Sequence, residues 1–288
     1  MGVCMSDKMF EAPIFYMAAQ IKFNTIADID KYVSELQSIW RSRFPDFSQQ
    51  ALNQFQFNLA IGAEESKLKQ TFVSRWHFKD ISGMAGLMLT NDSLTFQTTK
   101  YGTSTQFIET LIAALKDLHK VVSLAYVDAV GFRSLDAIVP RQNQDLSFYL
   151  KQSLLGLYSV LDGTLRRSSF EIALQREKLQ LVSRCILLSG GIGIPADLFP
   201  ILLNFQSRIQ EIDCVHAVLD NDAARLDRFE FDLDETSARL REVKAAISEA
   251  FYKAVTDDAL TYWKTEKHEP HRTEQSSNDL ATIAVLRK

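Results

Sequence analysis

The spacing of hydrophobic residues changes several times in the first part of the chain, and each change predicts a new element. A β-rich run after Pro13 predicts a strand over residues 14–23. From Ile26 onward hydrophobic residues recur every three or four positions, which predicts a helix that Pro45 ends. Alternating patterns then predict half-buried antiparallel strands, over residues 54–60, 72–79, 84–89 and 94–101. A second helix is traced by Phe107, Leu111, Leu115 and Leu118.

The remaining sequence shows a similar order of patterns. A strand over residues 121–139 precedes a helix whose hydrophobic positions run from Leu146 to Tyr158. Four further strands are predicted, at residues 168–174, 179–188, 209–219 and 226–231. Asp220-Asn221-Asp222 has the composition of a turn between the last two strands. A long final helix carries its hydrophobic residues from Leu240 to Trp263.

These patterns predict an α+β fold in which helices flank antiparallel sheets. The repeated order indicates two similar β-α-ββββ-α halves, at residues 10–120 and 121–264. One continuous α+β domain, in which the similar order is accidental, explains the same patterns equally well. Residues 265–288 form a polar tail whose last nine residues, LATIAVLRK, are apolar enough to dock or to bind a partner.

Composition narrows the functional classes. The chain has 288 residues, of which 46% are hydrophobic and 24% charged, an ordinary globular composition. The net charge of −4 gives no global basic field, so nucleic-acid binding would need a local basic patch. Three cysteines without a CxxC spacing favour free thiols in a reducing compartment. With no run of 18 apolar residues, we expect a cytoplasmic protein without a membrane partner.

The acidic stretch RFEFDLDE, at residues 228–235, concentrates candidate metal ligands. Asp232 and Asp234 share one face of a strand, and with Asp213 they could hold Mg²⁺, which prefers oxygen ligands. Asp232 and Glu235 also fit a capping box at the start of the final helix. Helix capping and the helix dipole each contribute about 0.5–1 kcal/mol, enough to explain these residues without chemistry. The capping role is the preferred interpretation.

Basic residues raise a second possibility. Arg166, Arg167 and Arg184 fall on neighbouring predicted strands and could form an anion-binding face, although a solvated sheet surface explains them as well. The glycine-rich SGGIGIP at residues 189–195 lacks the GK[ST] of a phosphate loop and opens onto no predicted helix. No nucleophile elbow such as GxSxG occurs.

Three stretches are similar to a known family: EAPIFYMAAQIKF, TTKYGTSTQFIETL with YVDAVGFRSLDAIVP, and FEFDLDETSARLREVKAAISEAFYKAVTDDALTYW. The chain resembles a sporadically distributed family of uncharacterised bacterial proteins. Matching positions are Ala12-Pro13-Ile14, Lys100-Tyr101, Gly131, Arg133, Asp232, Asp234, Phe251 and Trp263. The central strand lacks the Tyr-x-Asn part of the family pattern. The resemblance implies a bacterial or phage-borne origin and an accessory or defence-associated role, and it carries no established active site.

Together these observations predict a non-catalytic accessory or antitoxin-like protein that binds a protein partner and needs no cofactor. One alternative is a metal-dependent enzyme that acts on phosphate esters through Asp213, Asp232 and Asp234. Another is an anion or nucleotide sensor that uses the face of Arg166, Arg167 and Arg184.

Overall fold

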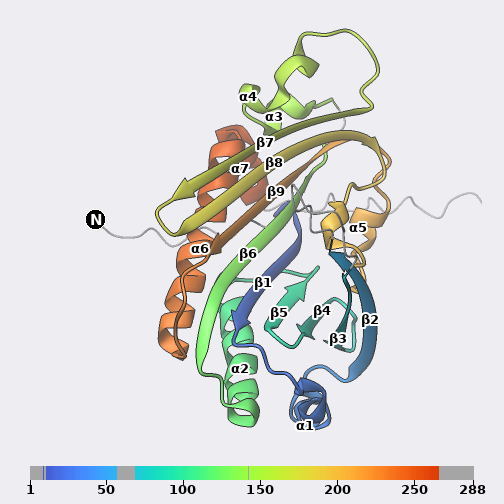
Figure 1. Ribbon diagram of the computed structural model, residues 1–288. Coiled ribbons are helices and arrows are strands. Elements are labelled where there is room, and N and C mark those ends of the chain that lie inside the picture. The colour runs from blue at the N-terminus through green and yellow to red at the C-terminus, as the bar shows by residue number, and fades with distance from the viewer. Residues whose placement is uncertain (1–8, 10, 57–68, 142, 266–288) are drawn as a thin grey trace, which may run out of the picture.

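A single antiparallel sheet of ten strands organises the protein in the computed structural model, which describes residues 9, 11–56, 69–141 and 143–265 (Figure 1). The strands are β1 (Ile14–Phe23), β2 (Asp46–Gln56), β3 (Lys69–Lys79), β4 (Ala85–Leu89), β5 (Ser93–Thr98), β6 (Tyr126–Ile138), β7 (Arg167–Arg176), β8 (Leu179–Gly190), β9 (Cys214–Arg225) and β10 (Phe229–Glu230). The α-helices are α1 (Val33–Trp40), α2 (Ser104–Val122), α3 (Leu146–Tyr149), α4 (Gln152–Leu155), α5 (Ser207–Gln210), α6 (Leu233–Ala254) and α7 (Asp257–Lys264). Three 3-10 helices are η1 (Ile29–Tyr32), η2 (Gly156–Ser159) and η3 (Ala196–Leu198). The predicted α+β class is confirmed.

The centre of the sheet is the antiparallel pair of β1 and β6. Their register runs from Ile14 opposite Asp136 to Phe23 opposite Val127. Strands β5, β4, β3 and β2 follow on the β1 side, and β9, β8 and β7 follow on the β6 side, while β10 adds a short pairing to β6. The strands predicted for the two halves therefore share one continuous sheet, with β2 and β7 at its two ends. The predicted boundary near residue 120 falls in the last turn of α2.

The turn predicted at Asp220-Asn221-Asp222 is wrong. These residues lie inside β9, where they pair with Arg133–Leu135 of β6 and with residues 182–184 of β8. Their turn-like composition is outweighed by polar partners on neighbouring strands, and Asp220 and Asn221 are almost fully buried. The second part of the chain consequently has three long strands after its first helices instead of four.

Two other predicted boundaries change. The helix predicted from Leu146 to Tyr158 is broken, because Leu150 is extended and bridges Val255, and Gly156 with a φ of 53° ends α4. The helix predicted from Ile26 divides into η1, which begins only at Ile29, and α1. Strand β2 starts at Asp46, directly after Pro45, and not at residue 54.

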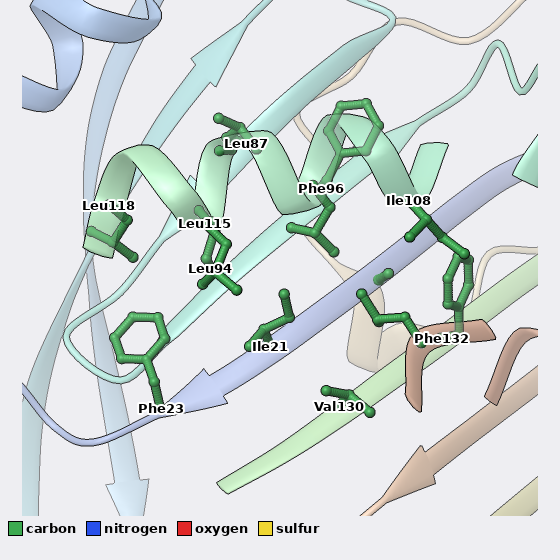
Figure 2. Close-up of a cluster of buried hydrophobic side chains, with 14 of the residues drawn as sticks. Ile21, Phe23, Leu87, Leu94, Phe96, Ile108, Leu115, Leu118, Val130 and Phe132 are labelled. Carbon is green, nitrogen blue, oxygen red and sulfur yellow. The ribbon is translucent and has the colours of Figure 1, made fainter. Parts of the chain in front are cut away.

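Helices α1, α2 and α6 cover one face of the sheet and enclose the largest core (Figure 2). Residues that alternate along each strand supply its floor, such as Ile21 of β1, Leu94 of β5 and Phe132 of β6. Helix α2 lays Ile108 and Leu115 on this floor, which its spacing of three and four residues predicts. Each such buried side chain contributes roughly 1.5–3 kcal/mol. This core fixes α2 and α6 against the middle of the sheet.

The opposite face of the sheet is covered differently. A smaller core forms there between Phe15 and Leu135 of the sheet and Ile209 and Ile212 of the connection from β8 to β9. Glycine-rich residues 189–195 span the end of β8 and the start of this connection, and the first helix after them is the three-residue η3. Much of the remaining surface on this face is polar. Among the described residues, no helix combines the length and apolar character needed to cross a bilayer.

Candidate functional site

The three acidic residues predicted as a Mg²⁺ site do not come together. Asp213 precedes β9, whereas Asp232 and Asp234 follow the other end of that strand, so roughly 40 Å of extended chain separates them. Asp232 is the N-cap of α6, and its Oδ1 accepts a hydrogen bond of 2.7 Å from the backbone N–H of Glu235. Asp232 thus takes the predicted N-cap role, whereas the Glu235 carboxylate of the predicted capping box accepts a 2.6 Å hydrogen bond from Arg239 Nε. Among the described residues, no group of three or more His, Cys, Asp or Glu side chains is placed to hold a metal ion.

The three arginines predicted as an anion-binding face also separate. Arg184 of β8 is partly buried and donates to Glu171 of β7 and to Asp220 of β9, the latter at 3.1 Å. Arg166 and Arg167, at the start of β7, are exposed and form no ion pair with another described residue. Arg184 is therefore occupied by carboxylates, while Arg166 and Arg167 remain open to solvent.

Arg184 belongs to a buried ion cluster on the face opposite the large core. Arg133 of β6, only 9% exposed, donates from Nε and Nη2 to the two carboxylate oxygens of Asp220, both at 2.8 Å. It also forms a bidentate pair with Asp197 of η3. The hydrogen bonds from Arg133 hold the pKa of Asp197 below its usual range. Burial raises the pKa of neighbouring Asp222, whose nearest cation is 4.0 Å away at Arg133. The cluster joins β6, β8, β9 and η3, which gives it a structural role.

A second buried polar group lies on the helix-covered face. Burial raises the pKa of Asp136 on β6 to about 7, against the opposing effects of Lys244 on α6, Arg208 on α5 and Ser134. Nearby on β9, Asn221 accepts a 2.7 Å hydrogen bond from Ser183 of β8, and its buried amide nitrogen has no partner. These residues place polar atoms beneath the middle of α6.

Exposed hydrophobic side chains gather on β7 and the segment before it. Of the twelve large hydrophobic residues exposed in the described parts of the chain, seven lie between residues 157 and 174, and three of these belong to β7. Phe170, Ile172 and Leu174 alternate along β7 and are 42%, 41% and 37% exposed. Their register opposite Cys185, Ser183 and Leu181 of β8 places them on the helix-covered face.

These side chains form one side of a groove between β7 and α6, here named the β7–α6 groove. Its floor is Phe170, Ile172 and Leu174 with Leu181 of β8, α6 supplies Ala250 and Ala254 as one wall, and Ser153 and Leu154 of α4 also line it. Arg176 and Glu249 pair across one end, and Lys253 lies toward the other. The groove has a volume of about 190 Å³.

The groove exists because α6 stops short of the sheet edge. Helix α6 packs on β6, β9 and part of β8, and β7 lies beyond them as the terminal strand (Figure 1). The alternation of Phe170, Ile172 and Leu174 indicates a buried face in the sequence. Only the strand order and the exposure of these side chains show that the row is left partly open to solvent.

A comparison with models of known protein families finds no match, and a search of curated proteins finds no similar sequence.

Removing the Asp232 cap tests the capping role against the metal hypothesis. Asp232→Ala should lower the free energy of unfolding by about 1 kcal/mol, because the Glu235 N–H loses its acceptor. Urea unfolding followed by circular dichroism measures this loss with and without Mg²⁺. A wild-type stability that rises with Mg²⁺, and no longer does so in Asp232→Ala, would contradict a purely capping role.

Neutralising the buried ion cluster should be far more damaging. Asp220→Asn leaves Arg133 and Arg184 short of a buried counter-charge, and we expect a loss of about 3–5 kcal/mol in urea unfolding. The matched control is Asp128→Asn, which breaks the exposed pair with Arg228 and should leave stability nearly unchanged. Equal effects of the two variants would contradict the structural role of the cluster.

Asp136 should make the protein less stable as pH rises from about 4 to about 7. In this window the unfolded chain has lost the Asp136 proton and the folded chain keeps it, so folding binds a proton. The free energy of unfolding then falls by up to about 1.4 kcal/mol per pH unit through this group. Asp136→Asn should flatten that decline in urea unfolding across the same window. An unchanged slope in the variant would show that Asp136 ionises normally in the folded state.

Proposed function

We propose that the protein is a non-catalytic accessory or antitoxin-like component that binds a protein partner through the β7–α6 groove. The supporting observation is the row of half-exposed apolar side chains Phe170, Ile172 and Leu174 beside α6. Contiguous apolar surface of this kind is costly to leave in water and commonly marks interaction sites. The same strand is a terminal strand of the sheet, which natural proteins ordinarily cover or interrupt.

The shape of the groove favours side chains of a protein over a small ligand. Its volume of about 190 Å³ is below the roughly 300–1,000 Å³ of small-molecule pockets. Phe170 and Leu174 are four residues apart on a strand, so the apolar row extends over roughly 14 Å. An elongated shallow groove with small alanines along one wall suits a row of protruding side chains.

The occupant we propose is an amphipathic α-helix of the partner. A helix packs about 10 Å from the helix or sheet beside it. The exposed face of β7 points to the side of the sheet on which α6 lies, and the row borders α6. A helix there would extend the layer formed by α1, α2 and α6. Its apolar residues at i, i+3, i+4 and i+7 would meet the row on β7, as in other helix-in-groove complexes.

The charges at the two ends of the groove indicate how a partner helix would be oriented. Lys253 lines the end of the groove near the start of β7, and alternation extended back from Phe170 places Arg166 on the same face, whereas Arg167 lies on the opposite face. Neither Lys253 nor Arg166 forms an ion pair with another described residue. At the opposite end Arg176 is already paired with Glu249 at 2.7 Å. We therefore propose that the helix carries acidic residues at the end that lies over Arg166 and Lys253. Such complementarity governs specificity and association rate.

A designed peptide tests this site directly. The probe is a fluorescent helical peptide with leucines at i, i+3, i+4 and i+7 and glutamates at one end, and the readout is fluorescence anisotropy. Wild-type protein should bind it, and Ile172→Glu should weaken binding about tenfold or more, because a carboxylate would be buried in an apolar contact.

Two controls make the result specific. Ile81 is 95% exposed in the turn between β3 and β4, so Ile81→Glu makes the same chemical change away from the groove and should bind like wild type. A peptide of the same composition, with its leucines spread around the helix, should bind weakly. Equal binding of both peptides, or undiminished binding by Ile172→Glu, would reject the groove as a helix-binding site.

A further inference from the structure

A second site is indicated on β3, at the far side of the sheet from β7. Arg75, His77 and Lys79 alternate along β3, and the residues between them, Trp76 and Phe78, are buried in the large core. The three basic side chains therefore share the face opposite α1 and α2. Register places Ser48 of β2 and Met88 of β4 on either side of His77.

His77 is buried without hydrogen-bond partners. Its side chain belongs to a residue only 4% exposed, and neither ring nitrogen bonds to any described atom. The Nε atom of Arg75 is likewise buried and unpartnered. Lys79, in contrast, pairs with Asp46 at 2.9 Å. Buried polar groups are ordinarily satisfied, and these three unpartnered nitrogens on one strand face include the Arg75 Nε–H and one imidazole N–H, two donors that lack an acceptor.

We propose that this face of β3 binds a small oxyanion of the phosphate type, held by Arg75 and His77. Phosphate oxygens accept hydrogen bonds from both side chains, and the Ser48 hydroxyl directly opposite His77 can add a donor. A metal cation is disfavoured because Arg75 and Lys79 place positive charge on both sides of the imidazole. The proposal is independent of the β7–α6 groove, which lies on the other half of the sheet.

The pKa of His77 should report whether an anion is bound at this site. Burial, together with the smaller effects of the positive charges of Arg75 and Lys79, lowers the pKa of His77 to about 4. The free imidazole is thus neutral near pH 7 and offers one donor. A bound anion reverses this electrostatic effect and favours the imidazolium, which offers two donors. Binding should therefore raise the pKa of His77.

Nuclear magnetic resonance of ¹³C-labelled histidine measures this in the full chain. Inorganic phosphate and adenosine monophosphate are the two probes, with chloride at matched ionic strength as the reference. We expect a saturable shift of the His77 signal and a rise of its pKa by about one unit or more. The signals of His119, which stacks on Phe231, and His216, which contacts the Cys214 carbonyl, should not move. A response to phosphate alone supports a free anion, and a response only to the nucleotide supports a phosphate group within a larger ligand.

Variants make the test quantitative. Arg75→Gln should weaken the affinity read from the His77 shift about tenfold or more, because it removes a charged donor. Arg41→Gln, which changes an exposed arginine next to α1, should leave the affinity unchanged. The wild-type titration decides the matter even if Arg75→Gln does not fold. No shift with either probe, or a shift that chloride reproduces, would overturn the proposal.

Discussion

The pairing of β1 with β6 is the constraint on which the rest of the structure depends. It is the ladder that joins β5, β4, β3 and β2 to β9, β8 and β7 among the described strands. Because adjacent strands alternate their side chains in register, this one pairing decides which residues of every strand meet the helices. A slip of β6 by one residue against β1 would turn Phe132 out of the large core while Ile21 stayed in it. It would also bring Arg133 onto the helix-covered face and separate it from its buried partner Asp220 on β9.

The width of the sheet then sets where the surface is left open. Nine strands side by side span roughly 40 Å, and each helix covers about 10 Å. Helices α1, α2 and α6 lie across this width, and residues of α3, α4 and α7 form a further core with β6, β8 and β9, while the face of β7 stays partly open to solvent. The apolar row of Phe170, Ile172 and Leu174 is therefore exposed because the sheet is wider than the layer of helices that covers it. That mismatch leaves the surface at which we propose that a partner helix binds.

The sequence predicts those features that local patterns govern. Alternation predicts β7 and β8, and the Asp232–Glu235 spacing predicts the cap of α6. Prediction from the sequence fails where a residue's structure depends on a strand that is distant in the chain. Asp220-Asn221-Asp222 has a turn composition, but Asp220 bonds Arg133, 87 residues away, and Arg184, 36 residues away. The groove cannot be predicted from the sequence for the same reason. Alternation in β7 is typical of a buried face, and only the strand order shows that β7 is terminal. The two unpartnered side chains on β3 likewise appear only once the register is known.

Photo-crosslinking in cells that contain the natural partner tests the central claim most directly. A benzoylphenylalanine placed at Ile172 reports what lies over β7, and the same group at Ile81 reports an exposed site away from the groove. We predict a discrete adduct from position 172 only, with the crosslink mapped to an amphipathic helix that has acidic residues at one end. Adducts of equal yield from both positions, or an adduct from position 81 alone, would contradict a binding surface at the β7–α6 groove.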